Sequence, residues 1–241
     1  MTLLAVKNVS KSFRGLKAVS DASFEIPQGS INALIGPNGA GKTTIFNMVA
    51  GVFPPDSGSI VFLGNAIHGL RPDQICAAGI GRTFQIVKPF AGLSVLENVM
   101  VGAFLRETSA TGARRVATEI LERLQLAPKR DLPASSLTLP DRKRLEVARA
   151  LATRPKLLLL DEVMAGLRPT ETDLMVEVFR DLNRSYGTTI LLIEHVMRAV
   201  MALAQHIGVL HHGEVIARGT PQEIVRNPRV LESYLGEETE L

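Results

Sequence analysis

The chain has 241 residues, 46% of them hydrophobic, which allows a substantial core in one large α/β domain or two small ones and excludes a mainly disordered chain. Lys and Arg number 27 against 24 Asp and Glu, and the formal net charge of +3 gives no reason to expect a nucleic-acid partner. One cysteine, Cys76, cannot form a disulfide within the chain, and the N-terminal residues lack the apolar run of a signal peptide, so we do not expect secretion.

The first strands are expected within residues 3–26, where apolar residues alternate with polar ones and Arg14-Gly15 interrupts the pattern. This alternation predicts antiparallel strands. The apolar run Ile31–Ile35 predicts a buried strand that leads directly into a glycine-rich segment.

The glycine-rich segment fits the phosphate-binding pattern G-x-x-x-x-G-K-[ST] without a mismatch. Its glycines let successive backbone N–H groups point into one concavity, which the positive end of the following helix reinforces. Lys42 would reach the outer phosphates of a nucleotide, and Thr43 would offer its hydroxyl to Mg²⁺. A turn that merely caps a helix is the alternative, which the flanking strand and helix disfavour. The predicted nucleotide-binding residues are Gly36, Pro37, Asn38, Gly39, Ala40, Gly41, Lys42, Thr43 and Thr44.

The middle of the chain changes from strand to helix patterns. Residues 80–84 predict a further strand, and from residue 93 to 153 the apolar spacing becomes helical, which predicts a helical insertion. Its last helix is expected over residues 141–152, with Pro140 at the first position. We interpret the basic run Arg142-Lys143-Arg144 as a solvated face of this helix rather than a nucleic-acid patch, because Glu146 and Arg149 follow it.

Two carboxylates follow the apolar run of residues 156–160, which predicts a central parallel strand, as do residues 188–193. Open α/β sheets bind ligands at the carboxyl ends of their strands. Asp161 could therefore hold Mg²⁺, and Glu162 could orient and deprotonate a water that attacks a terminal phosphate. A solvated pair that simply ends a strand is the alternative.

Helices complete the predicted pattern. One is expected over residues 170–183, between the two central strands, and others begin at the capping box Thr220-Pro221-Gln222-Glu223 and at Asn227-Pro228. The apolar window 188–210 contains charged residues, so it predicts a buried strand and a helix rather than a membrane span. An acidic tail begins at Gly236.

Several strings resemble the ATPases of ABC transporters: the phosphate-binding loop, LLLLDE, Gln85 in GRTFQ, His195 in IEHVM, and LTLPDRKRLEVARAL. The resemblance covers essentially the whole chain. It implies an α/β fold with a P-loop NTPase core of mainly parallel sheet, an N-terminal antiparallel β subdomain and a helical subdomain. The RecA-like core with the antiparallel subdomain would occupy residues 1–86 and 154–241, and the helical subdomain with its signature loop residues 87–153.

The resemblance also implies roles that the residues alone do not. Gln85 would couple the metal site to membrane subunits, His195 would contact the terminal phosphate of ATP, and Phe13 would stack on adenine in a pocket lined by Val19. From the residues alone, His195 is a hydrogen-bonded structural histidine, and Phe13 and Val19 are core residues. The implied catalytic residues are Glu162, His195 and Lys42, and the implied Mg²⁺ ligands are Thr43, Gln85 and Asp161.

The chain departs from the family pattern at the signature loop, Thr138-Leu139-Pro140, where both of the usual glycines are replaced. In the family this loop completes the ATP site of the opposite subunit. Pro140 has no N–H, and a lost hydrogen bond to a phosphate would cost on the order of 1.5 to 3 kcal/mol, so we expect the site completed by this loop to be impaired or differently built. A second departure is Arg168, where the family commonly has aspartate.

The strings GRTFQIVKPFAGLSVLENVMVG, LLLLDEVMAGLRPTE and VIARGTPQEIVRNPRVLESYLG resemble the ATPase subunits of branched-chain amino acid importers. This implies two membrane permease subunits, a second ATPase subunit in a heterodimer or homodimer, a periplasmic binding protein that acts indirectly, and a peripheral place at the cytoplasmic face of the inner membrane. Two alternatives are a soluble ATPase of the same superfamily acting in repair or translation, and a regulatory subunit that binds nucleotide without hydrolysing it.

Overall fold

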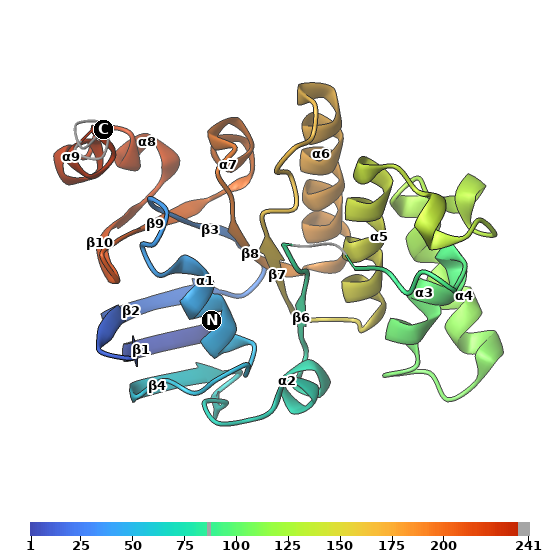
Figure 1. The fold of residues 1–241 in the computed structure, drawn as a ribbon, viewed down its shortest axis with the longest axis horizontal. Coiled ribbons are helices and arrows are strands. Elements are labelled where there is room, and N and C mark those ends of the chain that lie inside the picture. Colours follow the sequence, from blue (N-terminus) through green and yellow to red (C-terminus); the bar gives the residue numbers. More distant parts are fainter. Residues whose placement is uncertain (86–87, 236–241) are drawn as a thin grey trace.

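The computed structural model describes residues 1–85 and 88–235, and the acidic tail predicted from Gly236 lies outside the described residues. Two sheets organise the fold (Figure 1). The smaller sheet has the strand order β2-β1-β4-β5 and is antiparallel, which confirms the antiparallel strands predicted ahead of the phosphate-binding loop. Its strands are β1 (Thr2–Phe13), β2 (Leu16–Pro27), β4 (Ser57–Phe62) and β5 (Asn65–Ala66).

The larger sheet has the order β10-β9-β3-β8-β7-β6 and is parallel except for β10, which runs antiparallel to β9. Every residue of the three central strands β3, β8 and β7 is buried, as expected for strands covered on both faces. The strands are β3 (Ile31–Ile35), β6 (Ile80–Arg82), β7 (Leu157–Asp161), β8 (Thr189–Ile193), β9 (His206–His211) and β10 (Glu214–Gly219).

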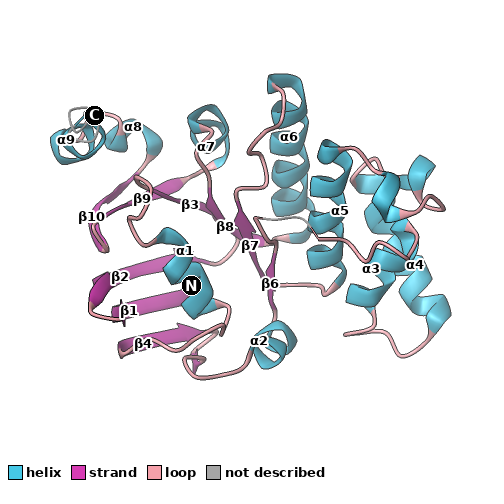
Figure 2. Ribbon diagram, viewed as in Figure 1, coloured by secondary structure: helices cyan, strands magenta, loops and turns pink. Residues whose placement is uncertain are grey.

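The larger sheet separates two hydrophobic clusters, and β7 shows the division most clearly. Leu158 and Leu160 belong to the cluster that includes α5, α6 and α7, whereas Leu157 and Leu159 belong to the cluster beneath α1 and the smaller sheet. Figure 2 shows the same layers, with α6 and α7 on one side of the sheet and α1 on the other. The helices are α1 (Lys42–Val49), α2 (Pro72–Ala78), α3 (Val95–Ala103), α4 (Ala110–Arg123), α5 (Leu139–Ala152), α6 (Pro169–Tyr186), α7 (Met197–Leu203), α8 (Pro221–Ile224) and α9 (Pro228–Leu235).

The predicted helical insertion is confirmed, because α3, α4 and α5 follow one another in this part of the chain with only short 3₁₀ turns besides. Helix α5 begins at Leu139, so Pro140 occupies its second position rather than the predicted first, and Thr138 is the N-cap. The prediction that the basic run forms a solvated face was wrong for Lys143, which is only 6% exposed, and the following Glu146 is buried too. The reason is that α5 packs against α3 and α4 as well as against β6 and β7.

Other boundaries differ by a few residues. Strand β6 ends at Arg82 rather than at residue 84. Helix α6 extends three residues beyond the predicted end at residue 183, until Gly187, with a φ of +63°, ends it. The capping box at Thr220 and the helix that begins at Pro228 are confirmed. The division into a core and a helical subdomain at residues 87 and 153 stays a prediction, since residues 86–87 are not described. Within residues 1–85 and 88–235, no helix combines the length and apolarity that a membrane crossing requires.

Candidate functional site

The phosphate-binding loop joins the end of β3 to the start of α1. Gly36, Gly39 and Gly41 have φ values of +148°, +79° and +100°, which favour glycine over every other residue. Space restricts two of these positions further. A Cβ on Gly36 would collide with the main-chain oxygen of Leu210, and one on Gly41 would lie 2.5 Å from the main-chain oxygen of Ala18. The loop is therefore held by the neighbouring strands, and its glycines are required by its conformation.

Lys42, the first residue of α1, is 6% exposed. Its Nζ donates hydrogen bonds to the main-chain oxygens of Gly36 and Pro37, each at 2.7 Å, so the ammonium group lies within the curl of the loop. Asn38 and Gly39 are exposed at the tip, Pro37 and Ala40 are buried, Thr43 is exposed and Thr44 half-buried. All nine predicted residues therefore surround one helix N-terminus, where backbone N–H groups favour an anion.

Glu162, directly after β7, joins two other predicted residues. Its Oε2 accepts a hydrogen bond from Gln85 Nε2 at 2.7 Å, and its Oε1 lies 2.8 Å from His195 Nε2. Gln85 follows β6, and His195 follows β8, the two strands that flank β7 in the sheet. The structure thus brings three predicted residues, from three parallel strands, to one carboxylate at the carboxyl edge of the sheet.

Asp161 is the last residue of β7 and its side chain is 2% exposed. Its Oδ2 accepts a hydrogen bond from Arg82 Nη2 at 2.9 Å, and Arg82 Nη1 donates to Asn47 Oδ1 at 2.6 Å. Burial raises the pKa of Asp161, and the Arg82 guanidinium opposes that shift. Among the described residues, the other carboxylate oxygen, Oδ1, has no hydrogen-bond partner, which leaves a buried hard oxygen donor beside the loop.

The two residues predicted to hold adenine lie in different environments. Phe13 is 41% exposed and packs edge-to-face on Phe53, with ring centroids 5.2 Å apart. Val19 is fully buried and packs beneath Gly41, as the core residue that the sequence pattern alone predicts, and its place in an adenine pocket stays a prediction. Successive side chains of a strand point to opposite faces, and the preceding Ala18 is the half-buried residue of this pair.

The signature loop opens α5, with Thr138 as the N-cap of the helix. The Thr138 hydroxyl donates to Asp141 Oδ2 at 2.8 Å, Leu139 is 49% exposed, and Pro140 is half-buried in the first helical turn. Asp141 also accepts a hydrogen bond from Lys129 and forms an ion pair with Arg144. Burial raises the pKa of Asp141, but the hydrogen bonds from Lys129 and Thr138 outweigh it and lower the pKa overall.

The comparisons with known proteins decide the family. A family model described as "ABC transporter" matches residues 19–165, more than half of the chain. The chain belongs to the ABC transporter family. A second model, described as "Branched-chain amino acid ATP-binding cassette transporter", matches residues 214–240.

Relatives match this ABC transporter ATPase over nearly its full length. The high-affinity branched-chain amino acid transport ATP-binding protein LivG of Salmonella typhimurium is 41% identical, with 98% of each chain covered. The lipopolysaccharide export system ATP-binding protein LptB of Escherichia coli is 37% identical, with 100% of each covered. The ADP conformation of MJ1267, an ATP-binding cassette of an ABC transporter, is 31% identical with a TM-score of 0.88, covering 98% of this chain and 99% of that one.

The ABC transporter ATPase also contains site residues that sequence reasoning missed. Arg82 and Asn47 hold Asp161 in place, and Lys143 donates from α5 to the main-chain oxygen of Glu162 at 2.8 Å. Glu194, beside His195, is 1% exposed, and burial raises its pKa to about 7. For Arg82 and Glu194, the available signal was a charged residue at the end of an apolar strand, because a charge buried there needs a partner.

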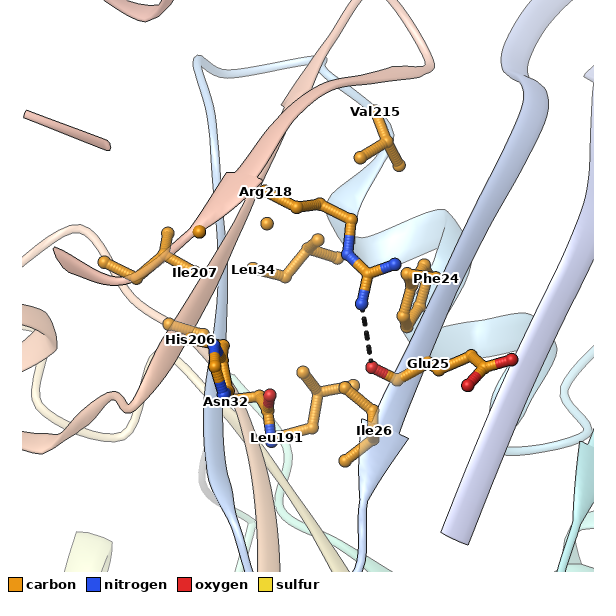
Figure 3. A pocket seen from close by; sticks show the side chains of 13 residues that line it. Phe24, Glu25, Ile26, Asn32, Leu34, Leu191, His206, Ile207, Val215 and Arg218 are labelled. Atoms are coloured by element: carbon orange, nitrogen blue, oxygen red, sulfur yellow. Dashed lines mark hydrogen bonds between the residues drawn. The ribbon is translucent and has the colours of Figure 1, made fainter. Parts of the chain in front are cut away.

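A cavity of about 240 Å³ lies elsewhere in the ABC transporter ATPase, between β2 and the edge strands of the larger sheet (Figure 3). Apolar side chains such as Phe24, Leu34 and Leu191 form much of its wall, and Arg218 Nη2 donates to the main-chain oxygen of Glu25 at 3.0 Å. None of the predicted site residues lines this cavity. The candidate site is therefore identified by its charged residues and its loop, independently of this cavity.

Proposed function

We propose that the chain binds ATP with Mg²⁺ and hydrolyses it to energise an importer of branched-chain amino acids. The observation that carries the proposal is the Glu162 carboxylate, held between Gln85 and His195 at the sheet edge where the phosphate-binding loop also lies. A general base must be oriented close to the group that it deprotonates. Contacts on both carboxylate oxygens supply that orientation.

In this proposal, the loop of residues 36–44 binds the phosphates through its backbone N–H groups and the α1 N-terminus. Lys42 exchanges its contacts with Gly36 and Pro37 for contacts with the outer phosphates. The ring of Phe13, which is 41% exposed beside Phe53, stacks on adenine.

Glu162 accepts a proton from the attacking water, and His195 contacts the terminal phosphate through the ring that now lies against Glu162. Asp161, Thr43 and Gln85 are the residues that would hold Mg²⁺, and the unpartnered, buried Oδ1 of Asp161 fits an oxygen-seeking cation. Bound there, the ion would neutralise charge that develops on the phosphates.

The partners follow from the family rather than from contacts in this chain. We propose that it lies at the cytoplasmic face of the inner membrane, below two permease subunits, with a periplasmic binding protein delivering the substrate. A second ATPase subunit, either a paralogue or another copy, would receive the loop of Thr138, Leu139 and Pro140. Because Pro140 lacks an N–H, that partner's site would be the weaker of two unequal sites.

The export protein LptB resembles the chain over its whole length, so overall similarity does not distinguish import from export. The match of residues 214–240 to the branched-chain amino acid transporter model favours amino acid import. Uptake of radiolabelled leucine by vesicles that contain the assembled transporter tests this part. ATP-dependent accumulation supports amino acid import, and co-purification with ribosomes or DNA instead of permeases would favour the soluble alternative.

The proposed hydrolysis is tested by Glu162→Gln. Loss of the base is expected to lower kcat by about 10²- to 10⁴-fold with ATP still bound, because the neutral amide keeps the shape of the side chain. Phosphate release and ATP retention are measured together, and Glu177→Gln, an exposed change on α6, serves as the control. Equal, negligible turnover in wild type and Glu162→Gln would instead favour the non-hydrolytic regulatory subunit.

A further inference from the structure

Two buried charged side chains contact the turn that carries Glu162. Lys143 on α5 is 6% exposed, and Glu194, which follows β8, is 1% exposed. Removing a charge from water is costly unless hydrogen bonds and opposite charges compensate. We therefore expect each of these two buried charges to have a specific partner.

Both side chains contact the main chain of the turn at residues 162–164. Lys143 Nζ donates to the main-chain oxygen of Glu162 at 2.8 Å, and Glu194 Oε1 accepts from the N–H of Met164, also at 2.8 Å. The N–H of Glu162 itself donates to the main-chain oxygen of Ile193 at 2.9 Å. The turn is thus held at its beginning from α5 and at its end from the segment after β8.

The conformation of Glu162 explains why such a turn needs support. Its φ is +50°, a left-handed conformation that residues other than glycine adopt only where the surroundings fix it. The direction of the carboxylate depends on this dihedral angle, because the side chain leaves the same Cα. If the contacts at Glu162 and Met164 were lost, the turn could relax and the carboxylate would point elsewhere.

The charges around the turn are arranged around the lysine. Burial lowers the pKa of Lys143, and the negative charges of Glu194 and Glu162 oppose that shift. Glu194 is in turn faced by Lys143 from α5 and by Glu162 from the end of β7. Its second oxygen, Oε2, has no hydrogen-bond partner among the described residues. Lys143 is therefore the cation next to two carboxylates, one of which is the proposed base.

We propose that Lys143 and Glu194 are positioning residues, which fix the turn at residues 162–164 so that the Glu162 carboxylate points at the reacting phosphate. The inference rests on the proposed function, which makes Glu162 the general base. It also connects two parts of the molecule. Helix α5 begins at the exposed signature loop, and Lys143 links the same helix to the main chain of Glu162, so a displacement of α5 moves the base.

Steady-state hydrolysis by the full chain tests the lysine. Lys143→Met is expected to lower kcat by at least about 10-fold and to leave the KM for ATP within about twofold, because the loop that binds ATP is untouched. Lys143→Arg, which keeps a donor, should recover most of the loss. The exposed Lys156→Met serves as the matched control.

The outcomes separate the two proposals. A wild-type chain and transporter without turnover overturn the proposed function and this inference with it. Normal wild-type turnover with an unchanged kcat in Lys143→Met overturns the positioning role alone. An equal fall in kcat for Lys143→Met and Lys143→Arg, accompanied by a rise in KM, would show general disruption and would also overturn it.

Amide hydrogen exchange at Met164 provides a readout that needs no turnover. Glu194→Ala should speed this exchange by at least about 10-fold, because the N–H loses its acceptor, whereas Glu194→Gln keeps an acceptor oxygen and should stay near wild type. Exchange at Ile193 serves as the internal reference for global unfolding. Unchanged exchange at Met164 in Glu194→Ala would refute the contact on which the inference depends.

Discussion

The sheet edge around Glu162 and the signature loop around Thr138 differ in exposure: Asp161 and Asp141 are both buried and paired, but Thr138 and Leu139 ahead of Asp141 are exposed. At the sheet edge, Glu162 contacts Gln85 and His195, and Asp161 contacts Arg82, all within the chain. At the signature loop, Leu139 is half exposed and the Thr138 hydroxyl turns back to Asp141 at the base of the loop. The first region is supported by neighbouring strands; the second presents its outer surface to solvent.

This difference predicts where substitutions lower stability and where they change turnover. A region whose charges are buried and paired resists change because breaking one pair leaves the other charge desolvated. An exposed loop at a helix start tolerates changes in the free chain, so its effects should appear in turnover rather than in folding.

Arg82→Met should produce the largest loss of stability. Asp161 would remain buried without its cation, and the free energy of unfolding is expected to fall by about 3 to 5 kcal/mol. Urea denaturation measures the change. The pair Arg71–Asp73 provides the control, because both side chains are exposed and Arg71→Met should change the stability little. Similar small losses in both variants would contradict the view that the sheet edge depends on buried pairs.

Glu194→Gln should change how stability depends on pH. The folded-state pKa of Glu194 is raised from 4.5 to about 7, so its proton is bound more tightly in the folded chain. The protonated Glu194 therefore contributes on the order of 3 kcal/mol to the free energy of unfolding. This contribution is fully present below pH 4.5 and is lost as the pH rises through about 7. Urea denaturation at pH 5 and pH 8 should show this loss in wild type and a smaller one in Glu194→Gln.

Glu223→Gln is the control for that experiment, because the capping hydrogen bonds from Thr220 lower the pKa of Glu223. Its contribution is present above the ordinary pKa and lost only in acid, so it should not alter the difference between pH 5 and pH 8. If Glu194→Gln also leaves that difference unchanged, Glu194 does not titrate in the folded chain as its burial implies.

Pro140→Gly should have the smallest effect on stability, below about 1 kcal/mol, because the residue lies in the half-exposed first turn of α5. In the assembled ATPase pair, however, a restored N–H should raise turnover by roughly 10-fold or more if the loop completes a partner's site. Pro169→Gly, at the first position of α6, is the matched control. No rise in rate would sink the idea that Pro140 impairs that site.

The phosphate-binding loop, both carboxylates and the central strands could be predicted from the sequence, because each is encoded by a short contiguous pattern. Such a pattern does not depend on which other elements pack against it. Sequence reasoning failed for Lys143, since the burial of α5 on several sides depends on α3, α4 and two strands that the helix pattern does not contain. For Val19, the residue pattern alone predicted a core position, and its complete burial agrees.

Gln85 and His195 show a further limit. Their approach to Glu162 arises from the strand order β8-β7-β6, which brings segments far apart in the sequence to one edge. No spacing along the chain encodes that order, so only the family resemblance indicated that these residues act together. Arg82 was missed for the same reason, because its partner Asp161 lies on the adjacent strand.

The side chains of Leu157 to Leu160 alternate between the two hydrophobic clusters, so β7 is part of both cores. Neither layer can melt while the other keeps this strand intact, so heating should unfold the two in one cooperative transition with a single calorimetric peak. Asp161 and Glu162 sit at the end of that strand. Loss of the site and loss of the fold should consequently occur at the same temperature.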